Sequence, residues 1–366
     1  MTTPLTTEEA AEAGLLPASH WQQEPLPENE DDDDGASTIG SVVSSTASLS
    51  ESIFKYRTIH GRTYHSEIGN ADSWEPNDAA HIDALEVGHH TCMIAIGHKL
   101  YLSPLEKDKV KKVVDIGTGV GSWGLTNHAC FFFFLPSDFA DEFPNAEVIG
   151  TDITPIQPSW VPPNCKFELD DCNAEWTWPD NTFDFIHCRY MFGVVTDWYD
   201  LFRQAYRTSK PGGWVESFVS CSTFMSDDGT VKANSAMSQW AKVWNAGGEK
   251  TGRTFMVYDH DLQRKGMEKA GFVDITVKEF YIPVGVWHKD KELAEKGLWW
   301  KMWMESDLDG YINYIFNVVM GWTPEESAVY AKHLRKELND PNIHAYFKAR
   351  TVYGRKPHPD KVPKSN

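Results

Sequence analysis

The chain of 366 residues lacks the features that mark membrane, secreted and zinc-binding proteins. Its longest apolar run, residues 129–135, is far shorter than the roughly 20 residues that a membrane-spanning helix needs. We expect no signal peptide, and the six cysteines include no C-x-x-C pair. These absences predict a protein of a reducing compartment, the cytosol or the nucleus.

Basic side chains are also scarce. The chain has 34 Lys and Arg against 53 Asp and Glu, which gives a formal net charge of −19. No basic patch suited to a phosphate backbone is present in the sequence, which argues against direct nucleic-acid binding. No metal site is expected, because His89 and His90 are adjacent and therefore do not share a helix face.

The acidic charge is concentrated in residues 1–50. This segment has ten acidic side chains and no Lys or Arg, and it contains the run Asp31–Asp34 and a Ser/Thr-rich stretch over 37–50. Such a composition buries too little apolar surface to order itself, so we predict a disordered tail. A solubilising tail is the simpler interpretation; binding of a basic protein partner such as a histone is the alternative.

The most informative segment is residues 112–124, KVVDIGTGVGSWG. It predicts a buried strand with Asp115 near its end, followed by a glycine-rich turn that opens a helix. Gly117, Gly119 and Gly121 allow the backbone to turn tightly and to approach a ligand. The glycines also satisfy the G-x-G-x-x-G pattern of dinucleotide binders. An acid beside the turn suits a cationic ligand, which favours S-adenosylmethionine (SAM) over a nicotinamide dinucleotide.

Further strands and one helix follow this turn. Alternating or buried apolar residues predict strands at 146–152, 165–172, 181–189 and 210–216, and the apolar spacing over 197–209 predicts a helix. Alternation of this kind indicates a parallel sheet with helices on both faces and a ligand at the carboxyl ends of the strands.

Two acids at these strand ends are candidate cofactor ligands. Asp152 is placed to accept hydrogen bonds from ribose hydroxyls, although it lies 31 residues after Gly121 where about 20 are usual. Asp171, with the backbone N–H of Cys172, is the candidate for the adenine. The alternative for Asp171 is a solvated acidic turn.

The excess length before Asp152 falls in residues 126–137, TNHACFFFFLPS, which fit neither an ordinary amphipathic helix nor a strand. Joining residue 125 to residue 138 restores a normal helix. We interpret the segment as an insertion, from retained intron sequence or a gene-model error. If the segment is real, we expect it to distort the helix beside the cofactor.

The end of the fourth strand offers the candidate catalytic side chains. His187 and Arg189 lie where a side chain can reach a transferred methyl group, and Tyr190 is a weaker third candidate. His187 has a reference pKa near neutrality, which suits a general base. A structural histidine whose direction is fixed by the strand is the alternative.

Two helical regions flank the predicted sheet. Residues 78–100 carry one apolar stripe, so they are expected to form a helix that packs across the domain as a lid or as plain core. Residues 284–340 are rich in Trp and Tyr and are predicted to be a helical insertion before a final strand at 345–354. This aromatic density suits a flat hydrophobic substrate or an ordinary core.

With these residues assembled, the chain resembles class I SAM-dependent methyltransferases, and more closely the fungal LaeA-like group associated with secondary metabolism. The resemblance covers roughly residues 50–357 and rests on a combination of motifs, which are GRTYH at 61–65, PND at 76–78, DIGTG at 115–119, IGTD at 149–152, FDFIH at 183–187, KPGGW at 210–214 and GRKP at 354–357. It implies a Rossmann-like α/β fold with a seven-stranded sheet, in one methyltransferase domain over 51–357 followed by a C-terminal tail over 358–366.

The same resemblance implies roles for individual residues. Asp115 and the glycine turn hold the methionine moiety of SAM, Asp152 holds the ribose, and Asp171 meets the adenine. Residues 126–137 are absent from the family pattern, which puts the affinity for SAM in question.

Two functions from different classes are consistent with the sequence. The first is an enzyme that methylates a small-molecule acceptor of fungal secondary metabolism, or a protein. The second is a LaeA-like nuclear regulatory protein with a SAM-binding fold and little turnover. A nicotinamide oxidoreductase is a distant third.

Overall fold

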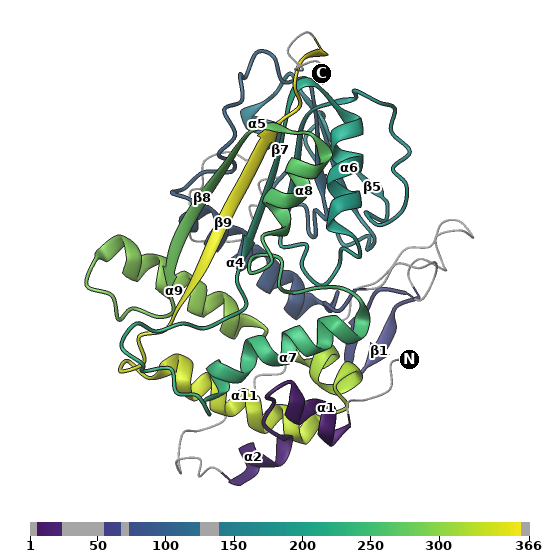
Figure 1. Cartoon of the computed structure of the whole chain (residues 1–366). Helices are drawn as coiled ribbons and strands as arrows, with labels where there is room; N and C mark the ends of the chain where they lie inside the picture. Colours follow the sequence, from purple (N-terminus) through teal and green to yellow (C-terminus); the bar gives the residue numbers. More distant parts are fainter. Residues whose placement is uncertain (1–5, 24–54, 67–72, 125–138, 360–366) are drawn as a thin grey trace, which may run out of the picture.

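The computed structural model describes residues 6–23, 55–66, 73–124 and 139–359. Its centre is a seven-stranded sheet in the order β5-β4-β3-β6-β7-β9-β8 (Figure 1). The strands from β5 to β7 are parallel, whereas β9 runs antiparallel to both of its neighbours. The predicted seven-stranded, Rossmann-like α/β fold is therefore confirmed.

Strands β3 to β6 are short, whereas β7, β8 and β9 are long. The parallel strands are β3 (Lys112–Ile116), β4 (Glu147–Asp152), β5 (Cys165–Leu169), β6 (Phe183–Arg189) and β7 (Ser209–Ser220). The antiparallel strands are β8 (Val273–Pro283) and β9 (Tyr346–Arg355). Apolar runs such as Val113–Val114 and Val148–Ile149 are buried, as central parallel strands require.

Helices pack against the sheet through apolar stripes. Helix α6 (Trp198–Thr208) begins after Asp197, whose side chain accepts the N–H groups of Tyr199 and Asp200. It buries Leu201 and Phe202, and α8 (Leu262–Ala270) packs beside it. Figure 1 shows these two helices side by side along the sheet. The short α5 (Phe139–Glu142) precedes β4.

A second group of helices lies beyond the carboxyl ends of the parallel strands. It contains α4 (Ala79–Ala95), α7 (Ala236–Thr251), α9 (Lys291–Ser306), α10 (Leu308–Ile312), the π-helix η1 (Asn313–Val319) and α11 (Pro324–Asn339). In Figure 1 α7 and α11 lie below the sheet, and α4 packs against α9. Residues 284–340 thus supply four helical elements between β8 and β9. The sequence analysis did not specify α7, α8 or β8.

The N-terminal residues depart from the prediction. Residues 6–23 form α1 (Thr7–Glu12) and α2 (Ala18–Gln23), and Trp21 is 2% exposed. The Trp21 ring lies 5.2 Å from the Tyr330 ring, and its carbonyl accepts a hydrogen bond from His333 Nε2 at 2.9 Å. The predicted disordered tail over 1–50 is therefore wrong for residues 6–23. The average composition of residues 1–50 is polar, but Trp21 within it packs against Tyr330 and His333 of α11.

A hairpin of β1 (Arg57–Ile59) and β2 (Arg62–Tyr64) joins the start of α4 to the helical insertion. The Arg62 guanidinium bonds both carboxylate oxygens of Asp78, at 2.6 and 2.7 Å, and both of Asp307, at 2.7 and 2.9 Å. His81 Nδ1 lies 2.8 Å from Asp307 Oδ2. Such bidentate ion pairs fix geometry as well as adding energy, so the hairpin, α4 and α10 form a rigid unit.

The predicted insertion and part of the acidic segment cannot be compared with the fold. Residues 126–137, the predicted insertion, lie outside the described residues, as do residues 24–50 of the acidic segment. Among the helices that the structure describes, none combines the length and the apolar character that crossing a bilayer demands.

Candidate active site

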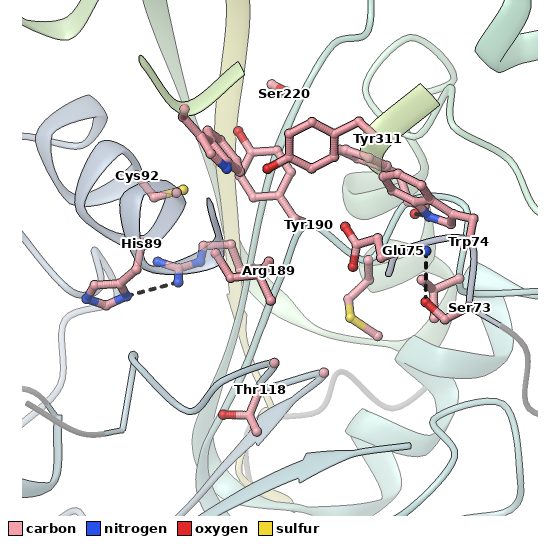
Figure 2. Close-up of a pocket in the computed structure, with 18 of the residues that line it drawn as sticks. Ser73, Trp74, Glu75, His89, Cys92, Thr118, Arg189, Tyr190, Ser220 and Tyr311 are labelled. Atoms are coloured by element: carbon pink, nitrogen blue, oxygen red, sulfur yellow. Dashed lines mark hydrogen bonds between the residues drawn. The ribbon is translucent and has the colours of Figure 1, made fainter. Parts of the chain in front are cut away.

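A pocket lies at the carboxyl ends of the parallel strands, between the sheet and the second group of helices (Figure 2). One wall comes from the turn after β3 and from the ends of β4, β5 and β6. The opposite wall comes from residues 73–75, α4, α7, α9 and α10. This is the edge of the sheet at which the strand pattern predicted a ligand.

The glycine turn forms the floor of the pocket. Asp115, Gly117, Thr118 and Gly119 all line it, and the Thr118 hydroxyl donates to Asp115 Oδ2 at 2.8 Å. Gly117 has a φ of +69°, and a Cβ there would lie 2.1 Å from the Met191 sulfur. Only glycine fits that position, so the backbone stays open to a ligand as a nucleotide-type cofactor requires.

Gly121 has a different role from its two neighbours in the motif. It is not among the pocket-lining residues, and its φ is +81°. A Cβ at Gly121 would lie 2.4 Å from the Phe167 ring of β5. The third glycine thus allows close packing between the turn and the sheet.

Asp152, at the end of β4, lines the pocket and braces the turn. Its Oδ2 accepts the Gly119 N–H at 2.9 Å, and its Oδ1 accepts the Thr154 N–H at 2.9 Å. Gln157 Nε2 donates to the Gly119 carbonyl at 2.6 Å from the other side. Burial raises the pKa of Asp152 to about 6, against these hydrogen bonds, which lower it. The carboxylate is therefore ionised at neutral pH and retains lone pairs for hydroxyl donors.

The acid at the end of β5 differs from the expected one. Asp170 and Cys172 line the pocket, whereas Asp171 does not. Asp171 Oδ1 instead accepts the backbone N–H of Asn173 at 2.9 Å and its side-chain N–H at 3.1 Å. Adjacent residues in extended chain point to opposite sides, so only one acid of the pair can face the cavity. The sequence prediction chose Asp171, whereas its neighbour Asp170 is the acid that lines the cavity.

His187 and Arg189 are also separated by the structure. His187 is 2% exposed and is not among the pocket-lining residues. Its Nδ1 lies 2.7 Å from Asp115 Oδ1, and its ring is stacked on Trp123 with centroids 4.2 Å apart. His187 therefore reaches the site only through Asp115, whereas Arg189 lies on the pocket wall itself.

Arg189 is a pocket-facing cation. Its Nη2 lies 3.0 Å from His89 Nδ1, and both residues line the pocket. Burial, together with the charge of Arg189, lowers the pKa of His89 well below its usual value, so His89 is neutral and accepts the hydrogen bond. Within the described ranges, no carboxylate pairs with Arg189. A partly buried cation with this environment suits an anionic group of a ligand.

The upper part of the pocket is aromatic, and sequence reasoning identified it only in part. The predicted aromatic region supplies Trp300, Trp303 and Tyr311 to the lining, whereas Trp322 packs against Phe316 and Tyr330 outside it. The remaining aromatic lining residues come from elsewhere in the chain and are Trp74, Tyr190, Phe192, Trp240, Trp244, Phe255 and Phe347. Some members of the region therefore line the cavity, and others pack in the core.

Glu75 is the polar residue that the sequence analysis missed. It lies on the pocket wall, one residue before the PND motif at 76–78. A charged residue between Trp74 and Pro76 gives no periodic signal, because the segment is neither helix nor strand. The adjacent PND motif at 76–78 was the only sequence feature that indicated a functional role for this segment.

Comparison with known proteins agrees with this geometry. Residues 94–277 match a family model described as a methyltransferase domain. The chain belongs to this methyltransferase family. The methyltransferase is 37% identical over 316 residues to methyltransferase pytC of Aspergillus terreus, a match that covers 86% of this chain and 92% of pytC.

Two further fungal relatives are more distant. The methyltransferase is 27% identical to the secondary metabolism regulator LAE1 of Cochliobolus heterostrophus, covering 81% of this chain and 94% of LAE1. It is also 27% identical to the probable methyltransferase tdiE of Emericella nidulans, covering 84% of this chain and 92% of tdiE. The predicted SAM dependence and the predicted relationship to LaeA-like proteins are confirmed.

Proposed function

We propose that this SAM-dependent methyltransferase acts on a small-molecule acceptor of fungal secondary metabolism. The observation that carries the proposal is the continuity of the pocket. The glycine turn and the aromatic residues of the helical insertion line the same cavity (Figure 2). A cavity with aromatic walls beside a cofactor cradle suits a small apolar molecule better than an extended protein surface.

The cofactor roles are proposed from position in the pocket. Asp115 and the glycine turn hold the methionine moiety, with Arg189 binding its carboxylate. Asp152 holds the ribose hydroxyls. The adenine lies against Asp170 and the backbone N–H of Cys172, a revision of the role first given to Asp171.

The position of Arg189 supports its pairing with the methionine carboxylate. Strands β3 and β6 pair in the register Asp115↔His187 and Ile116↔Cys188. Arg189 follows Cys188 at the end of β6, Gly117 follows Ile116 at the end of β3, and both residues line the pocket. The carboxylate and the ammonium of one amino-acid group then face Arg189 and Asp115 respectively.

The chemistry needs little from the protein besides geometry. When bound, SAM supplies an electrophilic methyl group on a positively charged sulfur. The chain's own residues bind and orient both reactants and exclude water, and positioning of this kind provides much of the rate acceleration in a two-substrate reaction.

Cofactor binding is tested by calorimetric titration with S-adenosylhomocysteine (SAH), the demethylated product. We expect SAH to bind the full chain and the surface variant Asp108→Ala, but not Asp115→Ala, with all three proteins folded by circular dichroism. Unchanged affinity in Asp115→Ala contradicts the role of Asp115. A variant lacking residues 126–137 tests the segment: binding by that variant alone marks the segment as the cause of lost function.

The acceptor class is tested with SAM labelled on its methyl group. The protein is incubated with the low-molecular-weight fraction and, separately, the protein fraction of a fungal culture extract. We expect the label in organic-soluble small molecules. Label confined to protein bands contradicts a small-molecule acceptor.

A regulatory role is the second candidate, favoured by the similarity to LAE1 along 94% of its length. This role predicts protein partners in nuclear extract and loss of them in a variant without residues 24–50. Absence of partners with both proteins removes the support for regulation.

A further inference from the structure

The Glu75 carboxylate lies on the pocket wall. Its backbone N–H donates to the Ser73 hydroxyl at 3.2 Å. Across the described part of the chain, no hydrogen bond or ion pair engages the carboxylate oxygens, although the residue lines the cavity. Figure 2 shows Glu75 entering from the side opposite Arg189, with Tyr190 and Tyr311 above and Thr118 below.

The backbone that follows Glu75 is held by contacts with the hairpin. Pro76 pairs with Tyr64 of the hairpin, and the Asn77 N–H donates to the Thr63 carbonyl at 2.8 Å. Asp78 follows, within the network of Arg62 and Asp307. Glu75 is thus fixed on a scaffold, as an acid–base group must be.

The charge of Glu75 acts on both halves of the site. The cofactor half contains the glycine turn and Asp152, and the aromatic half contains Tyr190, Trp303 and Tyr311. Burial is the main reason for the raised pKa of Tyr311 in the aromatic half, and the negative charge of Glu75 is the second. The same charge contributes to the raised pKa of Asp152 in the cofactor half. Burial raises the pKa of Glu75 itself. The carboxylate therefore lies where the two halves of the pocket meet, and it is a stronger base than an exposed glutamate.

Three polar groups of the aromatic half are poorly satisfied within the part of the chain that the structure describes. The hydroxyls of Tyr190 and Tyr311 and the indole N–H of Trp303 are buried and make no hydrogen bond of good geometry. Burial raises the pKa values of the two tyrosines, and weak contacts of Tyr311 with Trp303 and of Tyr190 with Ser220 lower them only in part. An indole N–H can only donate, and buried polar groups are normally satisfied. A ligand with oxygen atoms on a flat ring would satisfy these donors.

We propose that the acceptor is a flat aromatic molecule bearing a hydroxyl group, and that Glu75 takes the hydroxyl proton during O-methylation; this rests on the proposed function. The acceptor oxygen forms a bond to the methyl carbon while the carbon–sulfur bond breaks, leaving its electron pair on sulfur. The O–H proton passes to a carboxylate oxygen of Glu75. The products are a methyl ether, SAH and protonated Glu75, which returns its proton to solvent.

A neutral hydroxyl fits the charges of the site better than a cationic amine. An ammonium group has no lone pair with which to attack the methyl carbon, whereas a hydroxyl oxygen keeps its lone pairs in the space between Arg189 and Glu75. Besides Asp152 and Tyr311, the titratable groups that act on Glu75 are His81 and Asp307, which hydrogen-bond to each other.

The test uses 7-hydroxycoumarin, a flat ring with one hydroxyl and one carbonyl, whose product is 7-methoxycoumarin. We expect the wild type with SAM to form this ether. We expect Glu75→Gln to lower kcat by about 100-fold while its affinity for SAH changes by less than about twofold. The surface variant Glu106→Gln, which loses only a pairing with Lys109, is expected to match the wild type in both measurements.

The pH profile separates a base from a structural residue. A missing base is bypassed when the acceptor ionises by itself, so kcat of Glu75→Gln with 7-hydroxycoumarin should recover as the pH rises above the pKa of the probe. A fold defect does not recover in this way.

Several results overturn the proposal. If the Glu75→Gln variant keeps the wild-type kcat, Glu75 is not the base. If this variant no longer binds SAH, Glu75 binds the cofactor instead. Preferred methylation of 7-aminocoumarin, or no methylation of either coumarin by a protein that binds SAH, refutes a hydroxylated aromatic acceptor. A wild-type protein that does not bind SAH contradicts the proposed function itself, which is a separate failure.

Discussion

His187 Nδ1 lies 2.7 Å from Asp115 Oδ1, on the strand beside it, and both side chains are almost completely buried. The second carboxylate oxygen of Asp115 accepts the Thr118 hydroxyl at 2.8 Å. Asp115 is therefore held in one orientation under the glycine turn, and His187 acts as a positioning residue for it.

Replacement of His187 should consequently weaken cofactor binding. We expect His187→Ala to lower the affinity for SAH about tenfold, the effect of losing one hydrogen bond to a charged group. The exposed His260→Ala serves as control. A variant that binds SAH normally but turns over 7-hydroxycoumarin poorly would restore His187 as a candidate base.

Arg189 should matter for the amino-acid end of the cofactor alone. We expect Arg189→Met to weaken SAH binding by about 10- to 100-fold, because a charge-assisted pair is lost. Binding of 5′-methylthioadenosine, which has neither the carboxylate nor the ammonium, should be unchanged. Arg203→Met, which removes a surface pair with Asp200, is the control. Equal losses for both ligands would exclude carboxylate recognition.

The raised pKa of Asp152, about 6, predicts a pH dependence of cofactor binding. Ribose hydroxyls donate to the ionised carboxylate, so protonation below pH 6 opposes binding. By linkage, we expect SAH affinity to be about tenfold lower at pH 5 than at pH 7.5. In Asp152→Asn the affinity is expected to be weaker at pH 7.5 and the pH dependence to be flattened. If the pH dependence of SAH affinity persists in Asp152→Asn, a group other than Asp152 causes it.

The raised pKa of Asp152 affects the stability of the free protein in the opposite direction, because stability decreases as the pH rises whereas cofactor affinity increases. The folded-state pKa lies above that of the unfolded chain, so the contribution of Asp152 to stability is fully present below the unfolded pKa. It is lost as the pH rises through 6. Thermal unfolding without SAH, compared between wild type and Asp152→Asn at pH 5 and pH 7.5, measures this contribution.

The N-terminal helices should contribute to stability. Trp21 is 2% exposed against α11, so Trp21→Ala is expected to cost about 3–5 kcal/mol of unfolding free energy. Trp160→Ala provides a matched control, because Trp160 is 74% exposed. Equal melting temperatures for the two variants would mean that residues 6–23 do not pack as described.

The sequence by itself determined the parallel strands and the edge of the sheet that carries the site. Apolar runs around 113–116 and 148–151 can only be buried strands, and glycines at 117, 119 and 121 can only be a tight turn. These signals are local in the chain. They predicted the parallel sheet, the cofactor class and the positions of Asp115 and Asp152 at strand ends.

Only the tertiary structure decided which side chains face the cavity. It selected Asp170 over Asp171, turned His187 toward Asp115, and brought Glu75 to the junction of the cofactor and aromatic halves. It also gave residues 6–23 a surface on which to fold. Side-chain direction at a strand end, and the burial of a short apolar group, depend on partners far along the chain, 72 residues apart for His187 and Asp115 and 312 apart for Trp21 and His333. No local pattern records those partners, because they are set by how the helices pack on the sheet.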